Sequence, residues 1–161
     1  MSNKKPSLYL LNVLLTMLIL PIASIVLVSV VLGTSKFDWS LIGKWFVFWA
    51  IGVRLFIAGV RQIIKPAFTA KEIFNISSEE SFVIVKELGY SNFCMGLMGI
   101  FSVFNPCWTL IIAIGGGLYF GLAGVQHMTK KPVSTNETIA LISDIWIFGV
   151  MLLYLGFSFL I

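Results

Sequence analysis

Long apolar runs alternate with short polar stretches along the whole chain. A helix needs about 20 consecutive apolar residues to cross a bilayer, and five runs approach or exceed that length. The pattern predicts an all-α, polytopic transmembrane helix bundle that forms a single integral membrane domain, residues 1–161. The five predicted spans cover about residues 8–32, 41–64, 79–104, 107–128 and 137–160.

The polar stretches mark where these helices begin and end. Residues 65–77 are predicted to form a cytoplasmic loop with a short interfacial helix near 70–75, because 69-TAKE-72 matches a capping box. The motif 77-SSEE-80 predicts a helix start near Ser77, and Ser134 with Glu137 forms a third box. Asn105-Pro106 predicts the break between the third and fourth spans.

The first run follows Lys4 and Lys5 but is too long for the apolar core of a signal peptide. We therefore expect an uncleaved span, with a kink near Pro21.

Basic residues predict the orientation, because cytoplasmic loops carry an excess of Lys and Arg. With the N-terminus inside, the outer ends hold only Lys36 and Lys44. The cytoplasmic ends hold Lys4, Lys5, Arg61, Lys65, Lys71, Lys86, Lys130 and Lys131. This bias favours N-in/C-out with five spans. The alternative has four spans, with the third element lying partly in the interface.

Composition excludes a soluble domain, since 58% of residues are hydrophobic and 11% charged, against about 25% charged in soluble domains. The net charge of +4 is spread over several loops, which argues against nucleic-acid binding. Cys94 and Cys107 have no metal or redox spacing, and no disulfide between them is expected.

Ionisable residues inside the spans are the strongest candidates for function. Arg54 lies about 15 Å from the cytoplasmic end of its helix, where a charge costs about 3 kcal/mol on insertion scales. It should therefore face the bundle and meet a carboxylate, either Glu87 or Asp144. Arg61, two turns away on the same face, is expected to pair with Glu80 nearer the surface.

A second polar set lies on the neighbouring helices. Asn92 is expected to hydrogen-bond across helices. Gly117, Gly121, Gly124 and His127 follow at steps of four, three and three, so they share one helix face. The glycines are expected to pack closely against another helix, within one chain or between chains, and to direct His127 into the bundle.

Three motifs together resemble a domain-of-unknown-function family of small bacterial integral membrane proteins. They are 87-ELGYSN-92, 121-GLAGVQH-127 and the Ser-Asp pair at 143–144, within a region of about residues 54–150. The resemblance implies a small helical protein of the bacterial cytoplasmic membrane with no assigned activity. Carried over by position, it points to Glu80, Glu87, Asn92, His127 and Asp144.

The cluster has two interpretations: a cavity for a ligand or protons, or ion pairs that only fix helix register. We favour a binding or proton-responsive protein whose partners are the bilayer and a small anionic or amphiphilic ligand, such as a lipid or a quinone-like compound. One alternative is a lipid-modifying enzyme with Glu87, His127 and Asp144 as proton carriers. The other is an accessory subunit, in a homo-oligomer or with a membrane partner. No metal or other cofactor is expected, since two arginines compete for the carboxylates.

Overall fold

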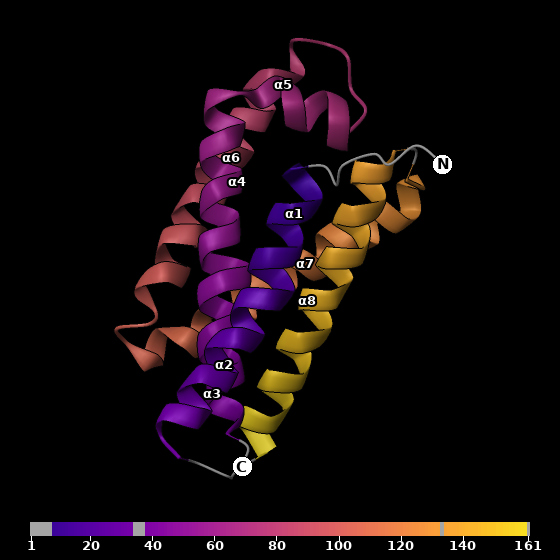
Figure 1. Ribbon diagram of the computed structural model, residues 1–161. Coiled ribbons are helices and arrows are strands. Elements are labelled where there is room, and N and C mark those ends of the chain that lie inside the picture. Colours follow the sequence, from indigo (N-terminus) through magenta and orange to yellow (C-terminus); the bar gives the residue numbers. More distant parts are fainter. Residues whose placement is uncertain (1–7, 34–37, 133, 161) are drawn as a thin grey trace.

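The computed structural model describes residues 8–33, 38–132 and 134–160, which form one bundle of packed helices (Figure 1). The predicted all-α class is confirmed. The elements are α1 (Leu8–Leu14), η1 (Leu15–Ile19), α2 (Leu20–Val31), α3 (Trp39–Phe46), η2 (Val47–Val53), α4 (Arg54–Ile64), α5 (Pro66–Phe68), η3 (Thr69–Ile73), α6 (Ser81–Phe101), α7 (Pro106–Lys130) and α8 (Thr135–Leu160). The three η segments are π-helical turns. Two of them join α1 to α2 and α3 to α4 as continuous helices.

Four helices are long and apolar enough to span a membrane: Leu8–Val31, Trp39–Ile64, α7 and α8. Their ends lie within a few residues of the predicted spans. The remaining long helix, α6, does not reach the same hydropathy, since it carries Lys86, Glu87 and Asn92. The chain is thus a multi-pass helical membrane protein.

Pro21 leaves a backbone carbonyl of the first helix free to accept a hydrogen bond from α8. A proline has no N–H, so the carbonyl four residues earlier loses its helical partner. That carbonyl belongs to Met17, and the indole Nε1 of Trp146 donates to it at 3.0 Å. The predicted kink site is therefore a π-helical turn whose open carbonyl is bonded to α8.

Glycines bring η2 and α4, which form one continuous helix, into backbone contact with α6. A Cβ added at Gly59 would lie 2.7 Å from the Gly89 carbonyl oxygen, and one added at Gly52 would lie 2.7 Å from the Ile100 backbone nitrogen. Small residues allow this approach in membrane helices. The sequence prediction missed this interface, because the glycines are spaced by seven residues and not by four.

The predicted glycine face of α7 packs against α8 of the same chain. Cβ atoms added at Gly117, Gly121 and Gly124 would meet the side chains of Met151, Phe148 and Ile145, respectively. Of the two predicted alternatives, the structure shows this face packed within the chain. Both Cys94 and Cys107 are free thiols.

The turn between α6 and α7, residues 102–105, lies at a different level along the length of the bundle from the other connections. The last turn of α6 lies beside Gly52, in the middle of the second helix. Figure 1 accordingly shows this turn short of the end at which α2, α3 and the C-terminus meet. Asn105 caps α7 by accepting a hydrogen bond from the Cys107 amide at 3.2 Å, as the predicted break requires.

The segment α5–η3 covers the opposite end of the bundle. Its helix starts earlier than predicted because Pro66 occupies a first-turn position. The predicted start of the next helix near Ser77 is wrong: α6 begins at Ser81. The cap at Ser134 is confirmed, since its Oγ accepts from the Glu137 amide at 3.1 Å. Lys130 Nζ donates to the Phe74 carbonyl and holds the segment against α7.

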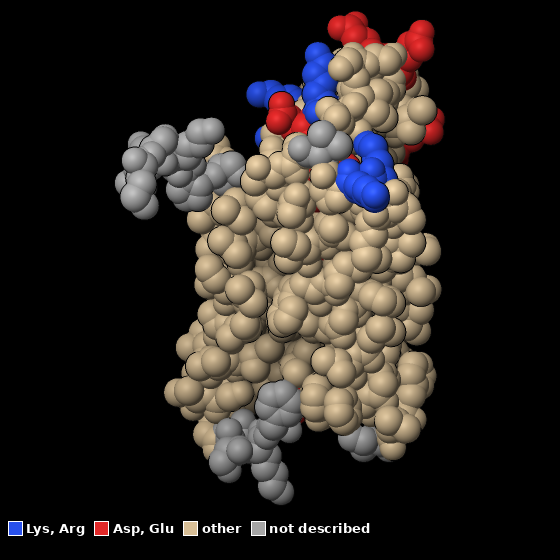
Figure 2. All heavy atoms as spheres, turned by 90° about the vertical axis from the view of Figure 1, so that its right-hand side faces the viewer, with Lys and Arg blue, Asp and Glu red and all other residues tan. Residues whose placement is uncertain are grey.

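Charged side chains gather at this same end of the molecule. Figure 2 shows blue and red atoms above a long surface without Lys, Arg, Asp or Glu. Lys4, Lys5 and Lys36, which entered the orientation prediction, lie outside the described residues.

Candidate ligand-binding site

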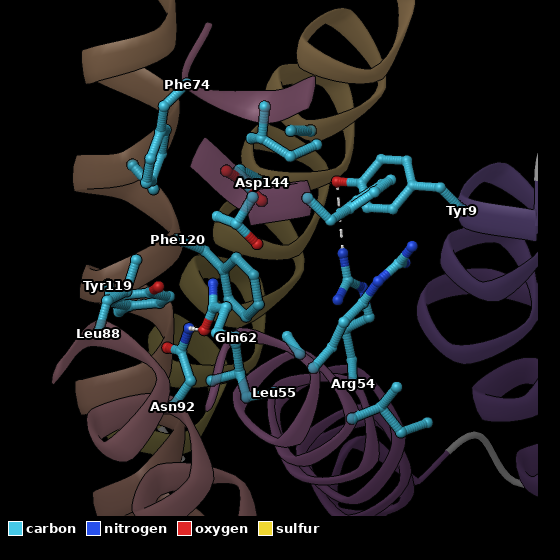
Figure 3. Close-up of a pocket in the computed structure, with 18 of the residues that line it drawn as sticks. Tyr9, Arg54, Leu55, Gln62, Phe74, Leu88, Asn92, Tyr119, Phe120 and Asp144 are labelled. Carbon is cyan, nitrogen blue, oxygen red and sulfur yellow. Dashed lines mark hydrogen bonds between the residues drawn. The ribbon is translucent and has the colours of Figure 1, made fainter. Parts of the chain in front are cut away.

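A cavity of about 670 Å³ opens in the half of the bundle that α5 and η3 cover. All the long helices contribute to its wall, which is partly apolar. Its polar lining consists of Tyr9, Asn12, Arg54, Arg61, Gln62, Thr69, Asn92, Tyr119, Gln126, His127 and Asp144. Figure 3 shows Arg54 and Tyr9 on one side of this space and Asn92 and Tyr119 on the other.

Arg54 begins α4 directly after the π-helical turn η2 and is half-buried in the cavity wall. Its Nη2 donates to the Tyr9 hydroxyl at 3.4 Å, and its guanidinium carbon lies 5.4 Å from the centroid of the same ring. Its buried Nε has no hydrogen-bond partner among the residues that the structure describes. A guanidinium has five N–H donors, so most of the hydrogen-bonding capacity of Arg54 is available.

The expected pairing of Arg54 with Glu87 is wrong. Glu87 is exposed on the outer face of α6 and does not line the cavity. The helix register is the reason: Gly89 packs against Gln62, near the end of α4, so Glu87 lies about level with Lys65. Asp144 does line the cavity, but it lies beyond 4.0 Å from the Arg54 nitrogens.

Arg61 lies at the rim of the cavity. Its guanidinium carbon is 3.5 Å from the ring centroid of Phe68 in α5, a cation–π contact that links α4 to the covering segment. The predicted pair with Glu80 is also wrong, since Glu80 is exposed just before α6 begins. Neither arginine forms an ion pair within 4.0 Å in the described part of the chain.

The ion pairs of this half lie between α7 and α8 instead. His127 Nδ1 is 3.8 Å from Glu137 Oε1, and His127 Nε2 is 3.9 Å from Asp144 Oδ2. Lys130 Nζ is 3.8 Å from the same Glu137 oxygen. Glu137 is fully buried, whereas 43% of the Lys130 side chain is exposed. The imidazole thus lies between two carboxylates that are two turns apart on α8.

Asn92 meets a partner that the sequence prediction did not name. Its Nδ2 donates to Gln62 Oε1 at 2.8 Å, and both amides are buried. Gln62 directly follows Arg61 and is polar within an apolar run, which is the signal that could have identified it. Tyr9 and Tyr119 were also missed, because a tyrosine in a membrane helix is unremarkable in the sequence.

The structure therefore gathers Arg54, Arg61, Asn92, His127 and Asp144 around one cavity and leaves Glu80 and Glu87 outside. Among the described residues that line this space are two permanent cations and a single carboxylate. Such an excess of positive charge in a partly apolar cavity suits an anionic ligand. No protein-family model, curated protein or solved structure matches this chain. The family resemblance accordingly stays a prediction.

Proposed function

We propose that this protein binds a small anionic amphiphile, with Arg54 as the principal contact for the anionic group. The observation that carries the proposal is the position of Arg54, half-buried in a cavity wall, with no carboxylate of the described residues within 4.0 Å. Intramembrane arginines normally pair with another group or line a functional pathway. Here an anionic ligand would supply the missing partner, and a bidentate contact would use the available donors.

The ligand is an amphiphile because the cavity joins polar and apolar walls. Arg54 and Asn92 line it together with Leu8, Ile84 and Leu122, whose side chains are largely exposed on the outer surface of the bundle. An apolar chain can therefore leave the cavity toward the hydrocarbon region while the head stays beside Arg54. A volume of about 670 Å³ also lies within the usual range for small-molecule sites, roughly 300–1,000 Å³.

We further propose that α6 is a fifth span, that the orientation is N-in/C-out, and that the membrane is a bacterial cytoplasmic membrane. The basic residues near the α5 end support this orientation. Single cysteines at Ser78 and Ser40, in a Cys94→Ala/Cys107→Ala background, test it. An impermeant maleimide applied from outside intact cells should label the Ser40 position and leave the Ser78 position unlabelled. The reverse pattern rejects the orientation.

The acid–base enzyme is less well supported, because Glu87 points away from His127 and the cavity. The accessory subunit remains the rival reading. It predicts that Arg54 contributes only packing, so an apolar replacement would leave ligand content unchanged.

Native mass spectrometry of detergent-purified protein tests the proposal. We expect the wild-type protein to retain added phosphatidate. The affinity of Arg54→Gln for phosphatidate should be at least tenfold lower, since a charge-assisted bidentate contact is worth about 1.5–3 kcal/mol. Lys44→Gln removes a cation at the other end of the molecule and is the matched control. Inorganic phosphate serves as the second probe: binding of phosphate as tight as that of phosphatidate would show that the ligand is a soluble anion. Equal phosphatidate retention by wild type and Arg54→Gln would reject the proposal.

A further inference from the structure

We infer that His127 relays protons between the charged end of the bundle and the cavity, so that the ligand is bound together with a proton. The inference rests on the proposed function for the identity of the ligand, but its core is the group Glu137–His127–Asp144. Each imidazole nitrogen faces a different carboxylate, at 3.8 and 3.9 Å. One carboxylate lies toward the charged end and the other lines the cavity.

Direct contact within this group favours one more proton than a neutral imidazole between two charged carboxylates would carry. A neutral imidazole has one N–H donor and one acceptor nitrogen. Its acceptor nitrogen would then face a carboxylate, and the two lone pairs would repel. In direct contact, the group is complementary only if the imidazole carries both protons or if one carboxyl is protonated. Either state leaves a proton that can be exchanged along the line of the three side chains.

The transfer itself is balanced and needs no other reactant. The Nε2 proton of His127 passes to Oδ2 of Asp144, and Nδ1 takes the proton of the Glu137 carboxyl. The imidazole is neutral before and after, with its tautomer exchanged, and the negative charge moves from Asp144 to Glu137. Both separations exceed the hydrogen-bond limit of about 3.2 Å, so a small side-chain rotation or one bridging water completes each contact.

The two ends of the relay meet different surroundings. Glu137 is buried beside Lys130, whose side chain reaches the exposed surface at the charged end. Protons can therefore enter or leave there.

Asp144 shares the cavity with Arg54 and Arg61 from α4, Tyr9 from α1 and Tyr119 from α7, whereas α6 contributes the uncharged Asn92. An anion beside Arg54 would repel a charged Asp144 across the same space. Binding of the anion therefore favours the state in which Asp144 has taken a proton from His127 and Glu137 has regained one from water at the charged end, a net uptake of one proton.

The ligand-free protein gives the first test, because His127 is the only histidine in the chain. Nitrogen-15 NMR of protein labelled at histidine reports the protonation of both ring nitrogens without assignment. We expect Asp144→Asn and Glu137→Gln each to change the tautomer or protonation state at a fixed pH. Glu87→Gln, which removes a carboxylate outside the cavity, should leave the spectrum unchanged. A spectrum that none of the three substitutions alters would overturn the relay.

Calorimetry of dodecyl sulfonate binding, in two buffers with different ionisation heats, gives the second test. The sulfonate keeps its charge at every pH used, so any proton taken up belongs to the protein. We expect wild-type protein to take up about one proton per anion bound and Asp144→Asn to take up nearly none. Asp144→Glu should restore the uptake.

The two measurements separate the two proposals. Binding without proton uptake in the wild type would overturn the coupling and leave the proposed function in place. A wild-type protein that does not bind the sulfonate counts against the proposed function, and the NMR spectra then decide the relay alone.

Discussion

The backbone contact between α4 and α6 allows a graded test by alanine substitution. In Gly59→Ala the new Cβ would lie 2.7 Å from the Gly89 carbonyl oxygen and 2.8 Å from the Cα of Phe93. These neighbours are backbone atoms and cannot rotate away, so the two helices must move apart by about 0.5 Å, and every contact across the interface weakens.

The expected magnitude follows from two opposing effects. Overpacking a tight interface costs about 1–3 kcal/mol. Replacing glycine by alanine within a helix returns up to about 1 kcal/mol, so Gly59→Ala should destabilise the protein by about 1–2 kcal/mol net. Gly121→Ala meets the Phe148 ring, which can shift, and should cost less. Gly149→Ala meets nothing within 4 Å and should be neutral or stabilising.

Equilibrium unfolding in mixed micelles of dodecyl maltoside and dodecyl sulfate, followed by circular dichroism, measures the three free energies of unfolding under identical conditions. Gly149→Ala serves as the matched control, since it makes the same chemical change in a helix without a neighbour. The reasoning is refuted if Gly59→Ala is as stable as Gly149→Ala, because the helices would then not be in backbone contact.

Two further outcomes follow from the hydrogen bonds near the cavity. The substitutions Asn92→Leu and Gln62→Leu, made singly and together, should give a coupling energy of about 0.6 kcal/mol in the same unfolding assay. This value is the mean for hydrogen bonds between membrane helices. A coupling energy of zero would show that the two amides do not interact. Lys130→Met removes the hydrogen bond to the Phe74 carbonyl and should speed amide hydrogen exchange in residues 66–74. Lys131→Met, the control, should not change these rates. Equal exchange rates in both variants would show that Lys130 does not hold this segment against α7.

Much of the fold could be predicted from apolar periodicity and capping residues. The ends of α7 and α8 follow from Asn105 and Ser134, whose side chains hold the first-turn amides. Local sequence determines such features, because the hydrogen bonds join residues two or three positions apart. The start of α6 was misplaced because 77-SSEE-80 matches a capping box but lies in a connecting turn.

The pairing of charged side chains could not be predicted, because it depends on the register between neighbouring helices. Counting residues from the helix ends predicted that Glu87 lies inside the membrane, at a depth similar to that of Arg54. The two side chains were therefore expected to pair. The α4–α6 contact instead aligns Gly89 with Gln62, which moves Glu87 to the end of α4. A shift of a few residues in the register between α4 and α6 therefore places Glu87 away from Arg54. Arg54 contacts Tyr9 instead.

The high turn between α6 and α7 has a consequence for the surrounding lipid. Since the last turn of α6 lies beside Gly52 and α3 begins well before Gly52, at Trp39, this side of the bundle is shorter than the α3 side. The turn exposes Phe101, Phe104 and Trp108, side chains suited to the headgroup boundary. With α6 as the proposed fifth span, the hydrocarbon layer must thin or its chains must tilt beside it. Each ångström of such mismatch costs a fraction of a kcal/mol, so the protein should prefer thin bilayers and orient with this side toward locally compressed lipid.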